Sequence, residues 1–308
     1  MISILLSAYN GGKYIIEQLD SLKNQSMKAD EVVIIDDNSS DNTYKLCKNY
    51  IDDNNLVNWM IIKNDINKGW QFNFHYGINY TKGDYIFYCD QDDIWLNDKI
   101  ETSMKILNAN TNLNVLATNE KKIFNDGTYE YLYKNKKFVE IIDVQKHPKD
   151  VFIRCSGCSM VVKRSFLDKI NKYYVEGYAH DAMAWNFASI DNSLGLSHSY
   201  TILHRIHGGN VTVKKHNNLL LRKQSCSNSI KIYETILSYL NDCYCDKIKT
   251  IKIYKRFLKS EKVRLEFLNN HKVKYIFYLI FNHKYLYRRP RQLFGDIYYS
   301  IFKNKEVK

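Results

Sequence analysis

Four short apolar runs, each followed by a helical pattern, make up most of the first 110 residues of this chain. The runs are ISILLSAY (2–9), EVVIIDD (31–37), WMIIKN (59–64) and YIFYCD (85–90). Apolar residues recur at helical spacing after each run, over 13–25, 44–51, 69–80 and 96–107. Continuous apolar runs are typical of strands that are covered on both faces. The alternation predicts an α/β fold with a doubly wound, mostly parallel sheet and helices on both faces.

Three of the four predicted strands end in polar residues. The polar ends are Ser7-Ala8-Tyr9-Asn10, Asp36-Asp37 and Asp90-Gln91-Asp92-Asp93. The carboxyl ends of parallel strands share one edge of a sheet, and ligands bind beyond that edge. We therefore expect these acids at the mouth of a site, because crowded carboxylates in a core would be costly.

Asp90 and Asp92 are two residues apart and offer hard oxygen ligands. Such ligands suit Mg²⁺ or Mn²⁺, and magnesium is commonly held by one or two carboxylates together with substrate phosphates. A solvated acidic turn or a helix cap would also explain these residues, but their position after a buried strand favours a cation. At the second strand, Asp36-Asp37 is placed to accept hydrogen bonds from a nucleotide, and Asp37 is equally placed to cap the next helix.

Two common nucleotide-binding motifs are missing from the sequence. Gly11-Gly12 lacks GxGxxG spacing, which disfavours a dinucleotide-binding enzyme, and no GxxxxGK[ST] occurs. The seven cysteines are most simply reduced thiols of a cytosolic protein, and we expect Cys155 and Cys158 as buried small residues on a strand. The N-terminus does not read as a signal peptide, and no stretch approaches the roughly 20 apolar residues of a membrane span, so a cytoplasmic location is expected.

Beyond residue 110 the pattern is less regular, with strands predicted at 114–124 and 155–164 and helices at 165–173 and 180–190. From residue 214 the pattern becomes helical and amphipathic. Residues 1–213 carry a net charge of −3 and residues 214–308 a net charge of +15. We therefore expect one α/β domain over 1–213 and a basic, aromatic-rich helical region over 214–308.

The last segment mixes aromatic residues with Lys and Arg, as in KYIFYLIFNHKYLYRRPRQLFGDIYYSIF (274–302). This composition suits the headgroup interface of an anionic membrane, so peripheral attachment to the inner face of the cell membrane is one expectation. A helical subdomain whose aromatic residues pack inward is an equal alternative. Nucleic-acid binding is not expected, because no recognition module is present.

Three strings, taken in order, resemble a family 2 glycosyltransferase. They are SILLSAYNGGKYIIEQLDSLKNQS, VVIIDDNSSDNT and NKGWQFNFHYGINYTKGDYIFYCDQDDIW. The resemblance is dense over residues 1–110 and looser to about 213. It implies a GT-A fold, the fold of nucleotide-diphospho-sugar transferases, with a nucleotide-sugar donor, a divalent cation and an inverting reaction. The domain over 1–213 would then be the catalytic domain.

The substrates are also implied by resemblance. The string DQDDIW and the later R-x-H-x-x-N are most similar to rhamnosyltransferases, which use a dTDP-sugar and build bacterial surface polysaccharides such as capsule or O-antigen. UDP-galactose, UDP-glucose and UDP-N-acetylhexosamines remain open as donors. The acceptor would be a growing, lipid-linked glycan.

The resemblance assigns roles to individual residues. On the donor side it implies Ser7, Ala8, Tyr9, Asn10, Asp36, Asp37, Asn67, Lys68, Gly69, Asp90, Gln91, Asp92, Arg205 and His207, with Asn210 beside the last two. The metal ligands would be Asp92, Asp90 and His207. On the acceptor side it implies Asp93, Trp95, Gly157, His180 and Trp185.

Asp181 is the expected catalytic base. His180-Asp181 occupies the place of the family's usual acidic pair, with His180 in place of the first acid. In an inverting transfer the acceptor hydroxyl attacks opposite the leaving diphosphate, so a carboxylate on the acceptor side can take its proton. A cation and basic side chains would stabilise the leaving group.

The residues alone leave alternatives open. Asp181 would also suit the first turn of a helix, Trp185 a core and His207 a surface position. Because His180 replaces an acid, a nucleotide-sugar-binding protein without transferase activity is the alternative function. A phosphatase or nuclease that uses the acid cluster is a third.

Overall fold

The computed structural model describes residues 1–124, 126–131, 134, 138–208, 218–282, 287 and 291–301. The described residues form two compact units. Unit 1 comprises Met1–Ile142, Ile153–Lys172 and Ala179–Gly208. Unit 2 comprises Asp143–Phe152, Tyr173–Tyr178 and the described residues from 218 onward. Two short segments therefore join the C-terminal unit from within the first 213 residues, and the predicted boundary at 213 lies outside the described residues.

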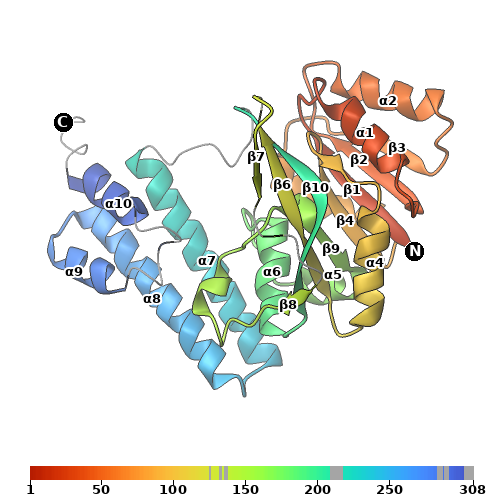
Figure 1. Cartoon of the computed structure of the whole chain (residues 1–308). Coiled ribbons are helices and arrows are strands. Elements are labelled where there is room, and N and C mark those ends of the chain that lie inside the picture. Colours follow the sequence, from red (N-terminus) through yellow and green to blue (C-terminus); the bar gives the residue numbers. More distant parts are fainter. Residues whose placement is uncertain are drawn as a thin grey trace. The chain divides into compact units, whose positions relative to one another are not determined.

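The described strands of unit 1 form one sheet (Figure 1). Its order is β3-β2-β1-β4-β9-β6-β10-β5, with β7 on β6 and β8 on β10. The strands are β1 (Ile2–Ala8), β2 (Glu31–Asp36), β3 (Trp59–Lys63), β4 (Tyr85–Asp90), β5 (Ile94–Trp95), β6 (Val115–Phe124), β7 (Tyr129–Tyr131), β8 (Val139–Ile141), β9 (Met160–Lys163) and β10 (Leu194–Ile206). The α/β class and the four N-terminal strands are confirmed.

The strand directions bring several carboxyl ends to one edge. β1, β2, β3 and β4 are mutually parallel. β9 is antiparallel to both β4 and β6, and β6 is parallel to β10. β10 therefore runs in the same direction as β4, and its carboxyl end lies at the same edge as those of β1, β2 and β4. The sheet is mixed because β9 enters antiparallel.

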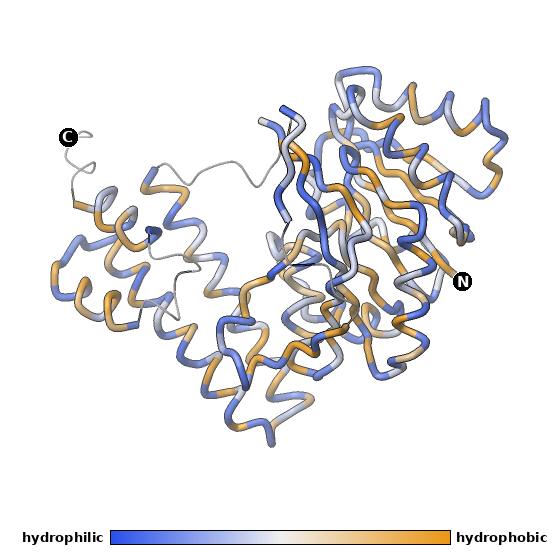
Figure 2. The backbone as a smooth tube through the Cα atoms, in the orientation of Figure 1, coloured by the Kyte–Doolittle hydropathy of each residue, from blue (hydrophilic) through white to orange (hydrophobic). Residues whose placement is uncertain are grey.

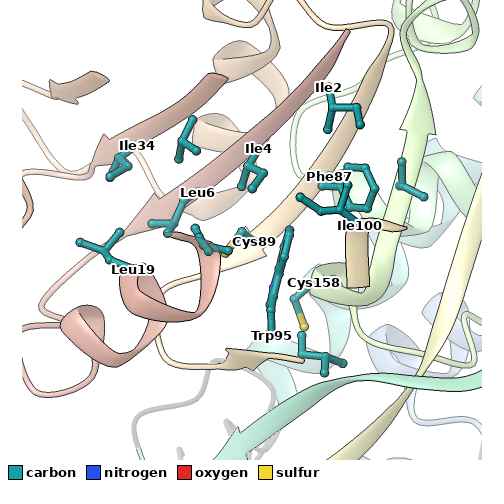
Figure 3. Close-up of a cluster of buried hydrophobic side chains, with 14 of the residues drawn as sticks. Ile2, Ile4, Leu6, Leu19, Ile34, Phe87, Cys89, Trp95, Ile100 and Cys158 are labelled. Carbon is teal, nitrogen blue, oxygen red and sulfur yellow. The ribbon is translucent and has the colours of Figure 1, made fainter. Parts of the chain in front are cut away.

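Helices cover both faces of the sheet. They are α1 (Ile15–Lys23), α2 (Thr43–Asp53), α3 (Trp70–Gly77), α4 (Lys99–Ala109), α5 (Arg164–Asn171) and α6 (His180–Ile190), with short 3₁₀ turns at Ile78–Tyr80 and Gly157–Ser159. On one face α1 and α4 place Leu19 and Ile100 in a core with Leu6 and Phe87 (Figure 3). The opposite face carries α3 and α6, where Phe74 contacts Tyr88.

Two segments of unit 1 differ from expectation. The CSGC segment is not a strand, because Gly157–Ser159 forms a 3₁₀ turn before β9. Cys158 is buried as expected, whereas Cys155 is only partly buried. β10 was not expected, because polar residues at 197–199 break its apolar alternation. Its register with β6 shifts on both sides of Tyr200, which is where a bulged strand accommodates such an interruption.

Unit 2 is helical in its C-terminal part, as expected. Its helices are α7 (Leu219–Cys243), α8 (Ile248–Asn270), α9 (Lys274–Phe281) and α10 (Arg291–Ile301), and a 3₁₀ turn lies at Pro148–Val151. α7, α8, α9 and α10 share a core that includes Cys226, Phe267 and Leu279. Among the described helices, none combines the length and apolar character needed to cross a membrane. Figure 2 shows hydrophobic residues recurring along α8, α9 and α10.

Candidate functional site

The site lies at the shared carboxyl edge of unit 1. Parallel pairing places Ala8 beside Asp36 and Ser7 beside Asp90. The polar ends of β1, β2 and β4 are thus adjacent, as the sequence predicted. The side chain of Ser7 accepts a hydrogen bond from Asn73 of α3 at 3.1 Å, and Ala8 is buried.

Gln91 ties the loop after β4 to the loop after β1. The amide of Tyr9 donates to Oε1 of Gln91 at 2.7 Å, and Nε2 of Gln91 donates back to the Tyr9 carbonyl at 2.9 Å. A Cβ at position 11 would lie 2.2 Å from the same Oε1, so any residue other than glycine would displace the Gln91 side chain from this position. The Tyr9 side chain remains exposed, where it is available to a ligand.

Gln91→Ala is expected to weaken donor binding about tenfold, since two hydrogen bonds that order the Tyr9 loop are lost. Isothermal calorimetry with the preferred nucleotide sugar measures the change. Gln224→Ala, at an exposed position of α7, is the matched control and should bind as the wild type does. Unchanged affinity in Gln91→Ala would show that the Tyr9 loop does not contact the donor.

A second set of hydrogen bonds orders the loops after β1 and β2. Asn10 has a φ of 50°, a left-handed conformation that asparagine tolerates. Its amide donates to Oγ of Ser39 at 3.0 Å, and its Oδ1 accepts from the amide of Ser40 at 2.9 Å. Asp36 is fully buried and accepts from the amide of Ser39 at 3.0 Å. The predicted nucleotide loops therefore form one preorganised unit.

Asp37 holds the loop that contains Asn67, Lys68 and Gly69. Its Oδ1 accepts from the amide of Lys68 and from Asn64 Nδ2, and its Oδ2 accepts from the amide of Gly69, each at 2.8 Å. The Asp37 side chain is nearly inaccessible, whereas Asn67 and Lys68 are exposed. The structure therefore gives Asp37 a loop-positioning role, and its recognition of the base stays a prediction.

A carboxylate–imidazole pair joins residues 91–93, which we call the acidic loop, to the residue that follows β10. Nε2 of His207 lies 2.7 Å from Oδ2 of Asp92. The ring of Tyr14, from the segment before α1, lies 4.9 Å from the His207 ring. Arg205, two residues before His207 and near the end of β10, also contacts Asp92. Two of the three predicted metal ligands are therefore in direct contact.

Arg205 binds the acidic loop at two points. Its Nε donates to the carbonyl of Asp92 at 2.9 Å, and its amide donates to Oδ1 of Asp93 at 3.0 Å. Its Nη2 pairs with Glu17 at 2.5 Å, and its guanidinium lies over the Tyr14 ring. Arg205 thus holds the shape of the loop, and its predicted contact with a diphosphate would require exchange of the Glu17 pair. Asn210 lies outside the described residues.

The third predicted ligand, Asp90, belongs to a neighbouring cluster. Possible ligand atoms of Asp90, Asp93 and Cys158 lie within 4.8 Å of one another. Burial, with the charges of Asp93 and Asp92, raises the pKa of Asp90 to about 8. Burial also raises the pKa of the Cys158 thiol, and a protonated thiol is a poor ligand for Mg²⁺ or Mn²⁺.

The donor set fits a divalent cation at Asp92 and His207. Carboxylate oxygen and imidazole nitrogen are both common ligands, and they already converge within hydrogen-bonding distance. After burial, repulsion by Asp93 and Asp92 contributes to the raised pKa of Asp90. A cation beside Asp92 would relieve that repulsion.

Asp181, the predicted base, lies in the first turn of α6. A Cβ on Gly157 would lie 3.0 Å from Cβ of Asp181 and 2.9 Å from Nε2 of His180, so the Gly157 turn approaches α6 closely. Burial raises the pKa of Asp181, and the charge of Asp181 contributes to the raised pKa of Asp90. The predicted base therefore lies close to the donor-side acids, with a pKa shifted toward the range that suits general base catalysis.

His180 occupies an aromatic cage and is not open to an acceptor. Its ring stacks on Phe74 with a centroid distance of 3.9 Å, and Tyr88 and Trp70 approach edge-on at 4.4 and 5.8 Å. Only 8% of the residue is exposed. Burial lowers the pKa of His180 to about 3, so the ring is neutral. The predicted acceptor contact is therefore corrected to a packing role.

His180→Phe is expected to remove one source of acid instability. The His180 pKa is about 3 in the fold, against an ordinary value of 6.5. The unfolded chain therefore binds a proton that the fold excludes, and stability is lost as the pH falls from 6.5 toward 3. At pH 5 this amounts to about 2 kcal/mol. Urea unfolding of both proteins at pH 7.5 and pH 5 measures the difference.

The matched control for this prediction is His147→Gln, at an exposed position. It should lose stability with pH as the wild type does. If the wild type and His180→Phe lose stability equally between pH 7.5 and pH 5, His180 is protonated in the fold and the cage assignment is wrong.

Three further acceptor predictions are corrected by burial. Trp95 is 2% exposed and lies in the core against Phe87, as Figure 3 shows. Trp185 is fully buried, and Asp93 is fully buried with Arg205 as its partner. Neither tryptophan is available to stack on a sugar, and Asp93 shapes the loop instead. Gly157 lies beside Asp181, and its predicted contact with an acceptor stays a prediction.

The sequence did not predict a polar network behind the acids. Nδ1 of His204 lies 2.9 Å from Oγ of Ser156 and 3.3 Å from Glu120, whose other oxygen accepts from the Ser156 amide at 3.2 Å. Burial opposes the charge on His204, but the hydrogen bond to Glu120 and the nearby acids raise the pKa of His204 to about 9. The network links β6 and β10 to the turn that carries Gly157.

Comparison with known proteins gives a consistent assignment. The profile of Glycosyl transferase family 2 matches residues 3–170. An uncharacterized glycosyltransferase of Rickettsia typhi is 26% identical over 216 residues, which cover 69% of this chain and 66%, just under two thirds, of that protein.

Two relatives have printed activities. The Escherichia coli protein WfaP, a UDP-Glc:alpha-D-GlcNAc-diphosphoundecaprenol beta-1,3-glucosyltransferase, is 27% identical over 240 residues, covering 75% of this chain and 87% of WfaP. The dTDP-rhamnosyl transferase RfbG of Shigella flexneri is 28% identical over 221 residues, covering 67% of this chain and 72% of RfbG.

Solved structures share the fold. S. aureus TarS, in complex with UDP-GlcNAc, superposes with a TM-score of 0.62 at 15% identity, covering 94% of this chain and 93% of the TarS chain. The mannosyltransferase PcManGT of Pyrobaculum calidifontis, in complex with GDP-Man and Mn²⁺, has a TM-score of 0.56 at 12% identity, covering 98% and 87%. The expected GT-A fold is confirmed. The family profile matches more than half of the residues of this chain, and the chain therefore belongs to glycosyl transferase family 2.

Proposed function

We propose that this glycosyltransferase moves a sugar, with inversion, from a nucleotide-diphosphate donor to a growing bacterial surface glycan in a cation-dependent reaction. The observation that carries the proposal is the Asp92–His207 pair at the carboxyl edge, with Asp181 near Asp90 at the start of α6. Asp92 and His207 suit the binding of a cation and a diphosphate, and Asp181 suits the role of proton acceptor.

On the donor side, the chain's own residues would bind and orient the nucleotide. The ordered loops that contain Tyr9 and Lys68 offer exposed side chains beside the acids. Mg²⁺ or Mn²⁺ would be held by Asp92 and His207, with Asp90 adjacent. When bound, the ion would neutralise charge that develops on the leaving diphosphate.

On the acceptor side, Asp181 would accept the proton of the attacking hydroxyl. Its raised pKa increases its strength as a base relative to an exposed aspartate. The neutral His180 leaves Asp181 without an adjacent second acid, so this chain would use a single carboxylate where the family commonly has two. The raised pKa of Asp181 and its place near Asp90 favour an enzyme over a protein that only binds nucleotide sugars.

The donor class follows from the relatives. RfbG is named for a dTDP-rhamnosyl transfer and WfaP for UDP-Glc transfer to a diphosphoundecaprenol-linked sugar. We infer that the donor is dTDP-rhamnose or a UDP-hexose and that the acceptor is lipid-linked. The product would then be a capsule or O-antigen precursor, and the chain would work on the cytoplasmic face of the cell membrane.

A transfer assay tests the proposal. Purified chain is incubated with dTDP-rhamnose, UDP-glucose, UDP-galactose or UDP-N-acetylhexosamines and with lipid-diphosphate acceptors, in Mn²⁺ or in EDTA. NMR of the product should show the opposite anomeric configuration to the donor, and EDTA should abolish turnover. Donor binding without transfer to any acceptor would favour the binding-protein alternative, and release of phosphate from simple esters would favour a phosphatase.

A further inference from the structure

We propose that one face of unit 2 is a docking surface for an anionic lipid bilayer. We call it the α9–α10 surface and define it by six exposed side chains. They are Val273, Phe277, Ile280, Phe281, Phe294 and Tyr298. The proposal concerns attachment of the chain and does not depend on which sugar it transfers.

The apolar residues of α9 form a stripe. Val273, Phe277, Ile280 and Phe281 are spaced by four, three and one residues, which places them on one side of a helix. Their exposed fractions are 61%, 65%, 46% and 79%. α9 therefore presents an apolar side to solvent along its whole length.

α10 presents a similar side. Phe294 and Tyr298 are one helical turn apart and are 69% and 48% exposed. α9 and α10 also contribute residues to one core, in which Leu279 and Leu293 are buried. Each helix thus has one apolar side that packs within unit 2 and a second apolar side that is exposed. The inward-packing alternative does not account for four of the described aromatic residues, Phe277, Phe281, Phe294 and Tyr298, which are exposed.

The charges around these helices have one sign at the surface. Among the described residues of 272–301, the bases are Lys272, Lys274 and Arg291, and the single acid is Asp296. That acid is fully buried, where Arg264 and Arg222 each lie 2.6 Å from one of its oxygens. The acid therefore does not offset the outward positive charge.

The basic residues flank the apolar stripe. Lys272 and Lys274 are exposed at the start of α9, and Arg291 is exposed at the start of α10. Aromatic and aliphatic side chains beside cations match the boundary between acyl chains and anionic headgroups.

Other occupants fit less well. A nucleic acid would use the positive charge but would gain little from exposed aliphatic residues such as Val273 and Ile280. A second copy of this chain would have to bring the exposed bases that flank the α9–α10 surface near like charges, which is unfavourable. A bilayer uses both the charge and the apolar area.

Vesicle flotation of the full chain, without nucleotide sugar, tests the proposal. The wild type should float with phosphatidylcholine vesicles that contain phosphatidylglycerol and should stay unbound with phosphatidylcholine alone. The triple variant Phe277→Ser, Phe281→Ser, Phe294→Ser should lose at least about tenfold in binding. The double variant Lys272→Glu, Lys274→Glu should lose at least about fivefold in vesicle binding for each positive charge that is removed.

Matched controls lie in unit 1. Val57 and Ile66 are 97% and 64% exposed, so Val57→Ser with Ile66→Ser removes exposed apolar residues elsewhere and should bind vesicles as the wild type does. Circular dichroism checks that the variants fold. Donor calorimetry on the same variants should be unchanged, which separates failure of this proposal from failure of the proposed function.

Three results would overturn the proposal. The first is wild-type protein that does not bind anionic vesicles. The second is vesicle binding that survives the Phe variants, which would indicate a general polyanion surface. The third is sedimentation showing that the Phe variants split a dimer while vesicle binding persists, which would assign the face to a second copy of the chain.

Discussion

Asp181→Asn is expected to lower kcat by about 10³-fold and to leave donor affinity unchanged. The amide keeps the shape of the side chain but cannot take the proton of the attacking hydroxyl. Because Asp181 lies at the start of α6 and not among the donor loops, calorimetry should give the same donor Kd as for the wild type. Steady-state transfer rates measure the loss in kcat.

The matched control is Asp168→Asn, an exposed aspartate of α5. It should retain wild-type turnover. The result that would contradict the assignment is a donor Kd that rises as much as kcat falls, since Asp181 would then bind the donor. Near-normal turnover in Asp181→Asn would exclude Asp181 as the base altogether.

Asp92→Asn is expected to weaken donor binding about 100-fold in Mn²⁺, with a comparable or larger loss of kcat. The substitution removes a charged ligand and the partner of His207. In EDTA the wild type and the variant should bind the donor equally weakly, because the cation no longer contributes. Calorimetry in both buffers measures the four affinities.

Asp98→Asn is the control for this prediction, because Asp98 is an exposed acid six residues further along the chain. It should keep the full response to Mn²⁺. Equal donor affinity for the wild type and Asp92→Asn in Mn²⁺ would show that Asp92 does not hold the cation.

The N-terminal half of the site could be predicted because its strands are parallel and end at one edge of the sheet. β1, β2 and β4 are continuous apolar runs with polar residues at their ends, and parallel pairing brings those ends together. Periodicity alone therefore located Asp36 and Asp90. The resemblance to a known family added the roles of Asp92, Asp181 and His207.

Burial of large side chains could not be predicted in the same way. Trp95 lies on β5, a strand of only two residues that pairs with β10, and no periodic pattern marks it. Trp185 lies on a helix that is buried almost all round, so an amphipathic stripe cannot be recognised. A tryptophan that stacks on a sugar and one that fills a core look the same in sequence.

Contacts between distant strands were also beyond the sequence. Glu120 and His204 are 84 residues apart and meet only because β6 pairs with β10. Strand alternation offered a partial signal: His204 points away from the side that carries Arg205 and His207. With β10 recognised as a strand, a separate partner for His204 would have been expected.

The most direct test of the account is the position of the cation itself. Crystals grown with Mn²⁺ and UDP or dTDP would reveal manganese by its anomalous scattering. The account predicts one peak at about 2.1 Å from a carboxylate oxygen of Asp92, with His207 and the diphosphate as further ligands. A peak held by Asp90, Asp93 and Cys158, or an Asp92 side chain turned away from a bound diphosphate, would contradict it.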